Sequence, residues 1–457
     1  MLTQKEIDFI VENAKADTAK LLLAGKKFQD INLKLCINCI ESRRKLISKL
    51  PQWYANTSLV YPFPLSAEQC SSEATGEYKR DLMATLLKNK KHNGPTEKTT
   101  TESACCISAA DLTGGMGVDS YYLSGLCKDD GGSQDGVFHY FERNRELCKA
   151  TEYNFKHLGA ENIKVHNAEL SKENIQQFLP TGLDFIFIDP ARRSKSDNSS
   201  KVISLDEYEP NLIELQNELF KHAPVLLAKV SPMADIKLNL KLLPNTTAVH
   251  IVSVDNECKE LLFVIESTAN AASATSATNA AASTAESAAT STAKRLYDIP
   301  ITAVNLKNAK VEPQTANTFT FTFKQEEQAS VFFATEVGEY LYEPNKSILK
   351  AGAFKLISQR YGCSKLAAST HLYTSNEFIE NFPGKIYTVE KSIPFSKKAI
   401  KEITARYPHA DLSARNFPLD TNALKKLSGI KDGGNKHIFA TSLNNGDKIL
   451  IIANTKK

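Results

Sequence analysis

The chain lacks any long apolar segment, which limits the classes of protein it can belong to. Its densest apolar run, residues 261–265, is as long as a strand, whereas a membrane helix needs roughly 18 to 20 apolar residues. The first residues include no apolar stretch of the kind found in secretory signals, so we expect no export. The nine cysteines are an odd number scattered over 457 residues, which favours reduced thiols and a cytoplasmic protein.

The sequence also lacks His and Cys residues at metal-site spacing, so we expect no bound metal. Cys36 and Cys39 form a lone C-x-x-C without a second ligand pair, and we interpret them as thiols in a helix core. The composition is otherwise that of an ordinary globular chain, with 42% hydrophobic and 24% charged residues. Its length predicts about three domains, and the net charge of +4 indicates no partner by itself.

Two patterns divide the first 267 residues. Residues 1–65 have the apolar spacing of helices and end at a group of prolines, which predicts an N-terminal helical domain. Residues 66–267 alternate short apolar runs with helical segments, which indicates right-handed βαβ units in a doubly wound parallel sheet. The last two strands are separated by only a short turn and predict an antiparallel pair at the sheet edge. The seven expected strands are 104–112, 137–142, 163–166, 183–189, 224–230, 248–254 and 260–266.

The remaining residues predict a linker and two small α+β domains. Residues 268–293 are almost wholly Ala, Ser, Thr and Asn and are interpreted as a low-complexity linker, with an ordered helix as the alternative. Residues 294–387 form an accessory region, in which alternation of Phe319, Phe321 and Phe323 predicts a strand and residues 345–360 predict one helix. Residues 388–457 predict two helices followed by two closing strands.

Polar motifs follow the ends of three of the expected strands. The run 111–119, D-L-T-G-G-M-G-V-D, opens a helix, and its glycines let the backbone approach a ligand beside the helix N-terminus. Its spacing matches neither the nicotinamide fingerprint nor the phosphate-binding loop. The second strand ends in Glu142, an acid placed to accept bonds from ribose hydroxyls, and the fourth ends in Asp189-Pro190. Because ligands collect at the carboxyl ends of such strands, these motifs predict one nucleotide site.

With these motifs in order, residues 66–266 resemble a class I S-adenosylmethionine-dependent methyltransferase. The whole chain also resembles a bacterial family of RNA methyltransferases that carry a small ferredoxin-like domain and then a THUMP-like domain at the C-terminus. The passages that carry this wider match are 68–73, 229–233, 256–261 and 413–418. The resemblance implies a Rossmann-like sheet of seven strands with the last pair antiparallel. It also implies S-adenosylmethionine as the cofactor.

The resemblance further implies roles for single residues. Asp111, Gly115 and Gly117 would line the methionine end of the cofactor, Glu142 would hold the ribose, and the loop after the third strand would lie beside the adenine. The full set of expected cofactor residues is Asp111, Thr113, Gly115, Gly117, Asp119, Glu142, Arg143, Ala168, Glu169 and Asp189. The expected catalytic residues are Asp189 and Pro190, which would face the acceptor atom, and Arg192 and Lys229, which could neutralise phosphate. Enzymes that methylate exocyclic amines usually carry an aromatic residue after D-P-P. Ala191-Arg192 here leaves open a different target atom, or stacking of the base by Arg192 or by a residue elsewhere.

The C-terminal part concentrates positive charge. Residues 385–457 hold fourteen basic and six acidic residues, an excess of eight that is larger than the net charge of the whole chain. A phosphate-binding surface requires such an excess, although solvated lysines on an ordinary domain are the alternative. Together with the resemblance, this favours a nucleobase of structured RNA, a tRNA or an rRNA, as the substrate. The other hypotheses are methylation of DNA, protein or a small molecule, and a non-catalytic RNA-binding protein.

Overall fold

The computed structural model describes residues 1–93, 106–128, 136–192, 208–267, 296–307 and 317–455. These residues form two compact units. The first comprises residues 1–255 and the strand that follows, and the second holds most of the described residues from 296 onwards. The expected linker, 268–293, lies outside the described residues. Among the described helices, none combines the length and apolar character needed to cross a bilayer.

The N-terminal part is helical, as predicted. A capping box between Thr3 and Glu6 starts the first helix, and proline starts the fourth and the fifth. Cys36 and Cys39 are buried in the third helix, and burial raises the pKa values of their thiols to about 12 and about 11. The interpretation of this pair as helix-core thiols is therefore confirmed. The helices are α1 (Gln4–Glu12), α2 (Thr18–Leu23), η1 (Gly25–Lys27), α3 (Leu33–Leu46), α4 (Pro51–Ala55) and α5 (Pro64–Gln69).

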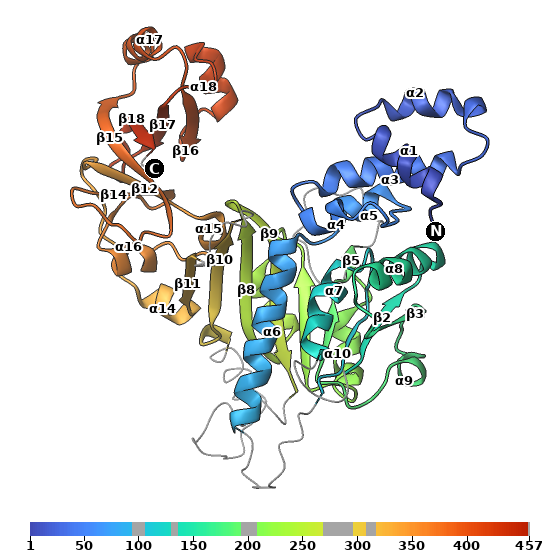
Figure 1. The fold of residues 1–457 in the computed structure, drawn as a ribbon. Helices are drawn as coiled ribbons and strands as arrows, with labels where there is room; N and C mark the ends of the chain where they lie inside the picture. The colour runs from blue at the N-terminus through green and yellow to red at the C-terminus, as the bar shows by residue number, and fades with distance from the viewer. Residues whose placement is uncertain (94–105, 129–135, 193–207, 268–295, 308–316, 456–457) are drawn as a thin grey trace, which may run out of the picture. The chain divides into compact units, whose positions relative to one another are not determined.

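A mostly parallel sheet dominates the first unit (Figure 1). Seven of the nine strands in this sheet follow one another in the order β8-β9-β7-β4-β1-β2-β3, with β1 parallel to β2 and β4, β4 parallel to β7, and β9 antiparallel to β7. Asp255 and Asn256, with φ of +48° and +62°, form the two-residue turn between β8 and β9. The expected class I methyltransferase sheet is confirmed. The strands are β1 (Ala109–Asp111), β2 (Phe138–Glu142), β3 (Ile163–Asn167), β4 (Phe185–Ile188), β7 (Val225–Val230), β8 (Thr246–Val254) and β9 (Glu257–Glu266).

Helices connect these strands and cover the sheet. The longest, α6, contacts both β8 and α7 (Figure 1). The 3-10 turn η2 (Gly125–Cys127) follows α7 directly. The helices of the sheet domain are α6 (Glu73–Asn93), α7 (Val118–Ser124), α8 (Arg145–His157), α9 (Ile175–Phe178), α10 (Leu212–Leu219) and α11 (Ile236–Leu242).

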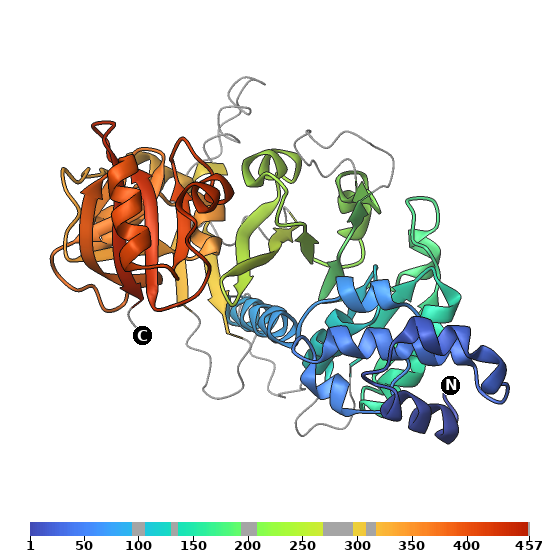
Figure 2. The ribbon, with the colours of Figure 1, turned by 90° about the horizontal axis from the view of Figure 1, so that it is seen from above.

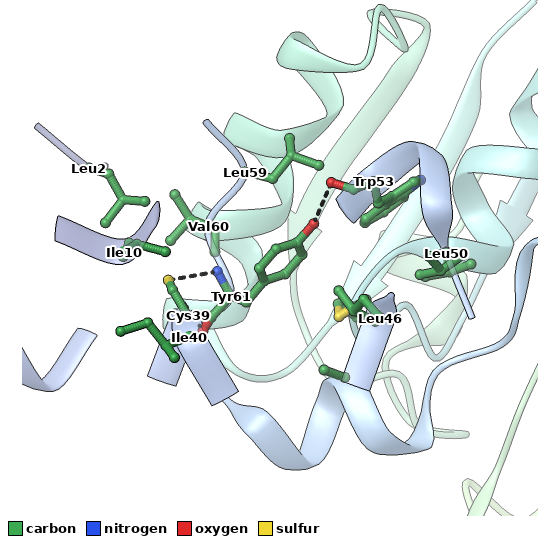
Figure 3. Close-up of a cluster of buried hydrophobic side chains, with 14 of the residues drawn as sticks. Leu2, Ile10, Cys39, Ile40, Leu46, Leu50, Trp53, Leu59, Val60 and Tyr61 are labelled. Carbon is green, nitrogen blue, oxygen red and sulfur yellow. Dashed lines mark hydrogen bonds between the residues drawn. The ribbon is translucent and has the colours of Figure 1, made fainter. Parts of the chain in front are cut away.

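The N-terminal helices pack against the helices that follow β1 and β2. Trp53 and Tyr61 share one buried cluster with Met116 and Val118, which flank Gly117 after β1 (Figure 3 shows the N-terminal side of the cluster). The backbone of Val60 both donates to and accepts from the side-chain amide of Asn154 in α8, each at 2.8 Å. The N-terminal domain thus shares a core with the glycine-containing loop.

The second unit corrects two expectations. Strand β11 (Asn317–Phe321) pairs with β10 (Ile301–Leu306) and ends before Phe323, which was expected to continue it. Phe323 begins helix α14 (Phe323–Gln328) because the Thr322 side chain caps that helix. The expected helix 345–360 is two helices, α15 (Lys346–Ala351) and α16 (Leu356–Tyr361). Gly352, with φ of +83°, ends the first of them.

The C-terminal residues form one seven-stranded sheet. Strand β15 pairs with β12 through its first half and with β18 through its second, so the expected domain boundary at residues 387–388 falls inside β15. Helices α17 (Lys397–Arg406) and α18 (Thr421–Ser428) share a core of buried side chains with strands of this sheet. The ribbon of this part is orange and red in Figure 2. The order is β13 (Ser364–Ala367), β14 (Thr370–Ser375), β12 (Tyr340–Pro344), β15 (Gly384–Pro394), β18 (Lys448–Thr455), β17 (Lys436–Ser442) and β16 (Asp411–Arg415).

Candidate functional site

The loop after β1 is tied to the end of β4. Asp111, the last residue of β1, accepts the backbone N–H of Thr113 at 2.9 Å on one oxygen and the hydroxyl of Ser120 at 2.6 Å on the other. The hydroxyl of Thr113 accepts the backbone N–H of Asp189 at 2.7 Å. Asp111 is buried, and its burial raises the pKa of the carboxyl to about 7. The structure therefore brings the first and third sequence motifs together.

Two glycines in this loop occupy positions that other residues would strain. Gly115 has φ of +55°, and its N–H donates to an oxygen of Glu142 at 3.0 Å. Gly117 has φ of +84°, and a Cβ there would lie 2.6 Å from the Thr151 side chain of α8. A Cβ at Gly115 would make an ordinary contact, 3.7 Å from the carbonyl oxygen of Thr113, so its positive φ and not crowding favours glycine there.

The acid at the end of β2 has both oxygens oriented by backbone. Besides the N–H of Gly115, the Glu142 carboxylate accepts the N–H of Asn144 at 2.7 Å. A carboxylate offers about four acceptor positions, so two hydroxyls of a diol can still be bound. Beside it, Arg143 forms an exposed ion pair with Glu169 at 3.0 Å, and the N–H of Ala168 donates to the carbonyl of Glu142 at 3.1 Å. The expected ribose and adenine residues are therefore neighbours.

A lysine holds the carboxylate at the end of β4. Lys229 of β7 lies 2.5 Å from Asp189 and 3.6 Å from Asp119, measured from its Nζ to the nearest carboxylate oxygen. Burial lowers the pKa of Lys229, but the neighbouring carboxylates raise it by a larger amount, so the net shift is upward. The side chain is only 13% exposed. The sequence suggested that Lys229 neutralises phosphate, whereas its charge is in fact shared by two carboxylates of the protein.

Sequence reasoning assigned no role to three residues that support this site. Lys79 of α6 is fully buried and lies 3.0 Å from Asp119 and 2.7 Å from Glu260 of β9. The hydroxyl of Ser71 donates to Asp119 at 2.7 Å. Ser71 and Glu260 fall within passages that resemble the family, but Lys79 looks in the sequence like any surface lysine of a helix. The name buried ionic cluster is used below for Ser71, Lys79, Asp119, Asp189, Lys229 and Glu260.

The residues after Asp189 turn away from the parallel sheet. Pro190 is buried, and Ala191–Arg192 form the short strand β5, which pairs with β6 (Tyr208–Glu209). The side chain of Arg192 lies outside the described part of the structure. The aromatic ring that this pairing brings close, that of Tyr208, is 3% exposed and offers no open face for stacking a base.

No metal-binding group was found in the part of the chain that the structure describes. Three or more His, Cys, Asp or Glu side chains gathered suitably for an ion do not occur among those residues. The carboxylates near the glycine loop are instead paired with lysines, hydroxyls or backbone N–H groups, as described above.

One solved structure is similar to this chain along its whole length. It is the crystal structure of a Porphyromonas gingivalis W83 protein assigned as a methyltransferase, 30% identical, with 100% of both chains covered and a TM-score of 0.74. The chain belongs to this methyltransferase family. Residues 340–383 match the profile of a ferredoxin-like domain and residues 384–455 that of a THUMP-like domain, so the C-terminal domains expected of the family are present.

Other solved structures match about a third of the chain. A Clostridium thermocellum protein assigned as an rRNA methylase is 14% identical over 35% of this chain and 88% of its own, with a TM-score of 0.26. A Streptococcus mutans protein assigned as a methyltransferase, in complex with SAH, is 12% identical over 35% and 88%, with a TM-score of 0.24. No curated protein matches the chain.

The cofactor of class I methyltransferases is S-adenosylmethionine, and the residues of this methyltransferase fit it. Its sulfonium is a cation, and Asp111, Asp119 and Asp189 surround the first turn after β1 with carboxyl groups. Its ribose is a diol, and Glu142 retains acceptor positions at the end of β2. The N–H of Gly115, which donates to Glu142, links the loop after β1 to that acceptor. The arrangement thus combines carboxyl groups around the loop after β1 with an acceptor suited to a ribose.

Proposed function

We propose that this methyltransferase transfers a methyl group to a nucleobase of structured RNA, a tRNA or an rRNA, and that Asp189 positions the acceptor. The observation that carries the proposal is the Asp189 carboxylate itself. It stands at the end of β4, is linked through Thr113 to the glycine loop, and has a side chain 36% exposed while one of its oxygens is bound to Lys229. An oriented and accessible carboxylate beside the cofactor loop is suited to a nucleophile that must lose a proton.

Bound S-adenosylmethionine supplies a methyl group that is already reactive, so the protein chiefly has to align donor and acceptor. Asp189 would accept a hydrogen bond from the acceptor atom and take the proton that this atom loses. Lys229 cannot act as that base because its raised pKa keeps it protonated. Lys229 instead holds Asp189 in one orientation. Glu142 would hold the ribose, and Asp111 would lie near the methionine end.

The C-terminal domain supports RNA as the substrate class. Lys397, Lys398 and Lys401 are exposed on α17, and further exposed lysines lie nearby in the sequence. Part of the positive excess is used internally, because Arg406 and Lys436 both pair with Glu390. The THUMP-like profile and the remaining exposed lysines together favour a phosphate-rich partner. The odd number of scattered cysteines is in keeping with a cytoplasmic enzyme.

Labelled methyl transfer to fractionated cellular RNA, followed by nucleoside analysis, tests the proposal and names the modified atom. Asp189→Asn keeps the size of the side chain but removes the proton acceptor, and we expect turnover to fall by about 10² to 10⁴ with cofactor affinity little changed. Asp81→Asn, which changes an exposed carboxylate of α6, is the matched control. Label that appears only in protein, DNA or small molecules would contradict an RNA substrate.

A salt titration of RNA binding tests the role of the C-terminal lysines. If they contact phosphates, log K should fall linearly with log salt concentration, by roughly 0.7 to 0.9 per contact. Replacing Lys397, Lys398 and Lys401 with Gln should reduce that slope by about 2 to 3 if all three make contacts. Salt-independent binding would exclude this interface. RNA binding by a wild-type protein that transfers no methyl group would favour the non-catalytic alternative.

A further inference from the structure

The mechanism above makes no use of Lys79, although it is the most deeply buried charge in the buried ionic cluster. Its side chain is 0% exposed, and its ammonium lies 2.7 and 2.9 Å from the two oxygens of Glu260 and 3.0 Å from Oδ1 of Asp119. An ammonium buried so completely is retained only where its partners compensate the lost hydration. The question is what Lys79 does for the carboxylates it contacts.

Ser71 joins the two lysines of the cluster. Its hydroxyl accepts from Lys79 at 3.3 Å and from Lys229 at 3.4 Å, and donates to Oδ2 of Asp119 at 2.7 Å. One hydroxyl has one donor and two acceptor positions, so every position on Ser71 is used. Asp119 therefore has Lys79 on one oxygen, and Ser71 and the more distant Lys229 on the other.

Lys229 lies within reach of two carboxylates and is shared unequally between them. Its Nζ is 2.5 Å from Asp189 and 3.6 Å from Asp119, so it is bound to the first and only near the second. Asp119 does not need a close contact with Lys229 because Lys79 already supplies a positive charge at 3.0 Å. Without that charge, the buried Asp119 carboxylate would be the stronger attractor of Lys229.

We propose that Lys79 is a positioning residue that reserves Lys229 for Asp189. By compensating Asp119, it leaves the Lys229 ammonium on the exposed carboxylate at the acceptor side, and the orientation of Asp189 follows. This inference rests on the proposed function of Asp189 in methyl transfer. It also makes the start of α6 part of the catalytic apparatus, although α6 precedes the first strand of the sheet.

The competing explanation is that Lys79 only braces α6 against β9. Lys90 does so near the other end of the same helix, where it lies 3.2 Å from Glu266 of β9. Its side chain is 31% exposed, and its pair contains no residue of the buried ionic cluster. Lys90→Met is therefore the matched control, because it removes an α6–β9 ion pair without touching Asp119.

A double-mutant cycle separates the two explanations. Lys79→Met should lower kcat by about tenfold to a hundredfold, as expected when a reacting group is displaced by about 1 Å, and should change the KM for the cofactor little. Asp119→Asn removes the competing charge. In that background Lys79→Met should lower kcat by no more than about twofold. An equal loss of kcat in both backgrounds would overturn the proposal and favour a brace. Lys90→Met should leave kcat unchanged.

Crystal structures give a readout that does not depend on turnover. In Lys79→Met we expect Lys229 Nζ to lie within hydrogen-bonding distance of Asp119 and to have left Asp189. If Lys79→Met does not fold, Lys79→Met combined with Glu260→Gln removes the stranded carboxylate and is examined in its place. Lys229 still bound to Asp189 in these variants would refute the role of Lys79. Absence of methyl transfer by the wild type would refute only the proposed function.

Discussion

Asp111 should make cofactor affinity depend on pH near neutrality. The pKa of its carboxyl is raised from 3.8 to about 7, mainly by burial and in smaller part by the charges of Asp119 and Asp189, against the opposing hydrogen bonds from Ser120 and Thr113. A shift of about three pKa units corresponds to about 4 kcal/mol between the protonated and the ionised form in the folded protein. Because the folded-state pKa lies above the unfolded-state value, protonation of Asp111 stabilises the folded protein, and this stabilisation is complete below about pH 4. It is lost as the pH rises through 7.

A sulfonium cation bound near Asp111, as proposed above, would favour the ionised carboxylate. Below pH 7 the protein must first release that proton, so affinity for S-adenosylmethionine should fall by about tenfold for each further pH unit. Calorimetry in buffers of different ionisation enthalpy should then detect release of close to one proton at about pH 6. Asp111→Asn keeps the size of the side chain and removes the titrating group, so its affinity should be flat over the same range.

Two controls complete this test. The melting temperature of Asp111→Asn should exceed that of the wild type by more at pH 8 than at pH 5. At the higher pH only the wild type carries a buried charge at position 111. Glu142→Gln should weaken binding at every pH while preserving the slope, since that carboxylate would contact the ribose. A wild-type affinity that does not change between about pH 5.5 and pH 8 would refute the placement of Asp111 beside the sulfonium.

Three further predictions concern the stability of the fold. Gly117→Ala should destabilise the fold and abolish cofactor binding, because Gly117 has a positive φ and lies close to a side chain of α8. Gly159→Ala is the control: its φ is +67° and no atom lies within 4 Å, so it should cost only about 1 kcal/mol on thermal unfolding. Asn154→Ala should cost about 2 to 4 kcal/mol by denaturant titration, because it leaves a buried backbone N–H and C=O unpaired. Arg415→Ala should cost about 2 to 4 kcal/mol because the buried carboxylate of Glu343, 2.8 Å away, loses its charge partner, and a loss below 0.5 kcal/mol would contradict this.

The parallel sheet was predictable because its signal is local and repeated. Each strand is a short apolar run, each connection has a helical pattern, and the order of the polar residues at the strand ends follows from the direction of the chain. The same local reasoning failed where a single residue changed the element. Thr322 caps a helix within a run of alternating phenylalanines, and Gly352 ends a helix within a continuous helical pattern. Both residues are visible in the sequence, but the apolar pattern around them is stronger.

The contacts of the loop after β1 were only partly predictable. The spacing of Asp111, Gly115 and Gly117 indicated a ligand-binding turn, and the chain direction placed Glu142 and Asp189 at the same edge. That Asp111 is satisfied by Ser120, one turn into the following helix, depends on how that helix is set against the sheet. Such a setting is decided by packing, which includes residues of the N-terminal domain that lie far from the motif in sequence.

The burial of Lys79 has a cause that can be traced to a neighbouring residue. Gly76, one turn earlier in α6, lies so close to α7 that a Cβ there would be 2.3 Å from the ring of Tyr122. A glycine inside a helix costs about 1 kcal/mol relative to alanine, so close packing is a physical reason for its presence. This contact brings α6 near the first turn of α7, where Asp119 lies, and places Lys79 between that carboxylate and Glu260. Sequence alone shows a glycine and a lysine three positions apart in a charged helix. Only the distance between two helices turns that pair into a support for the site.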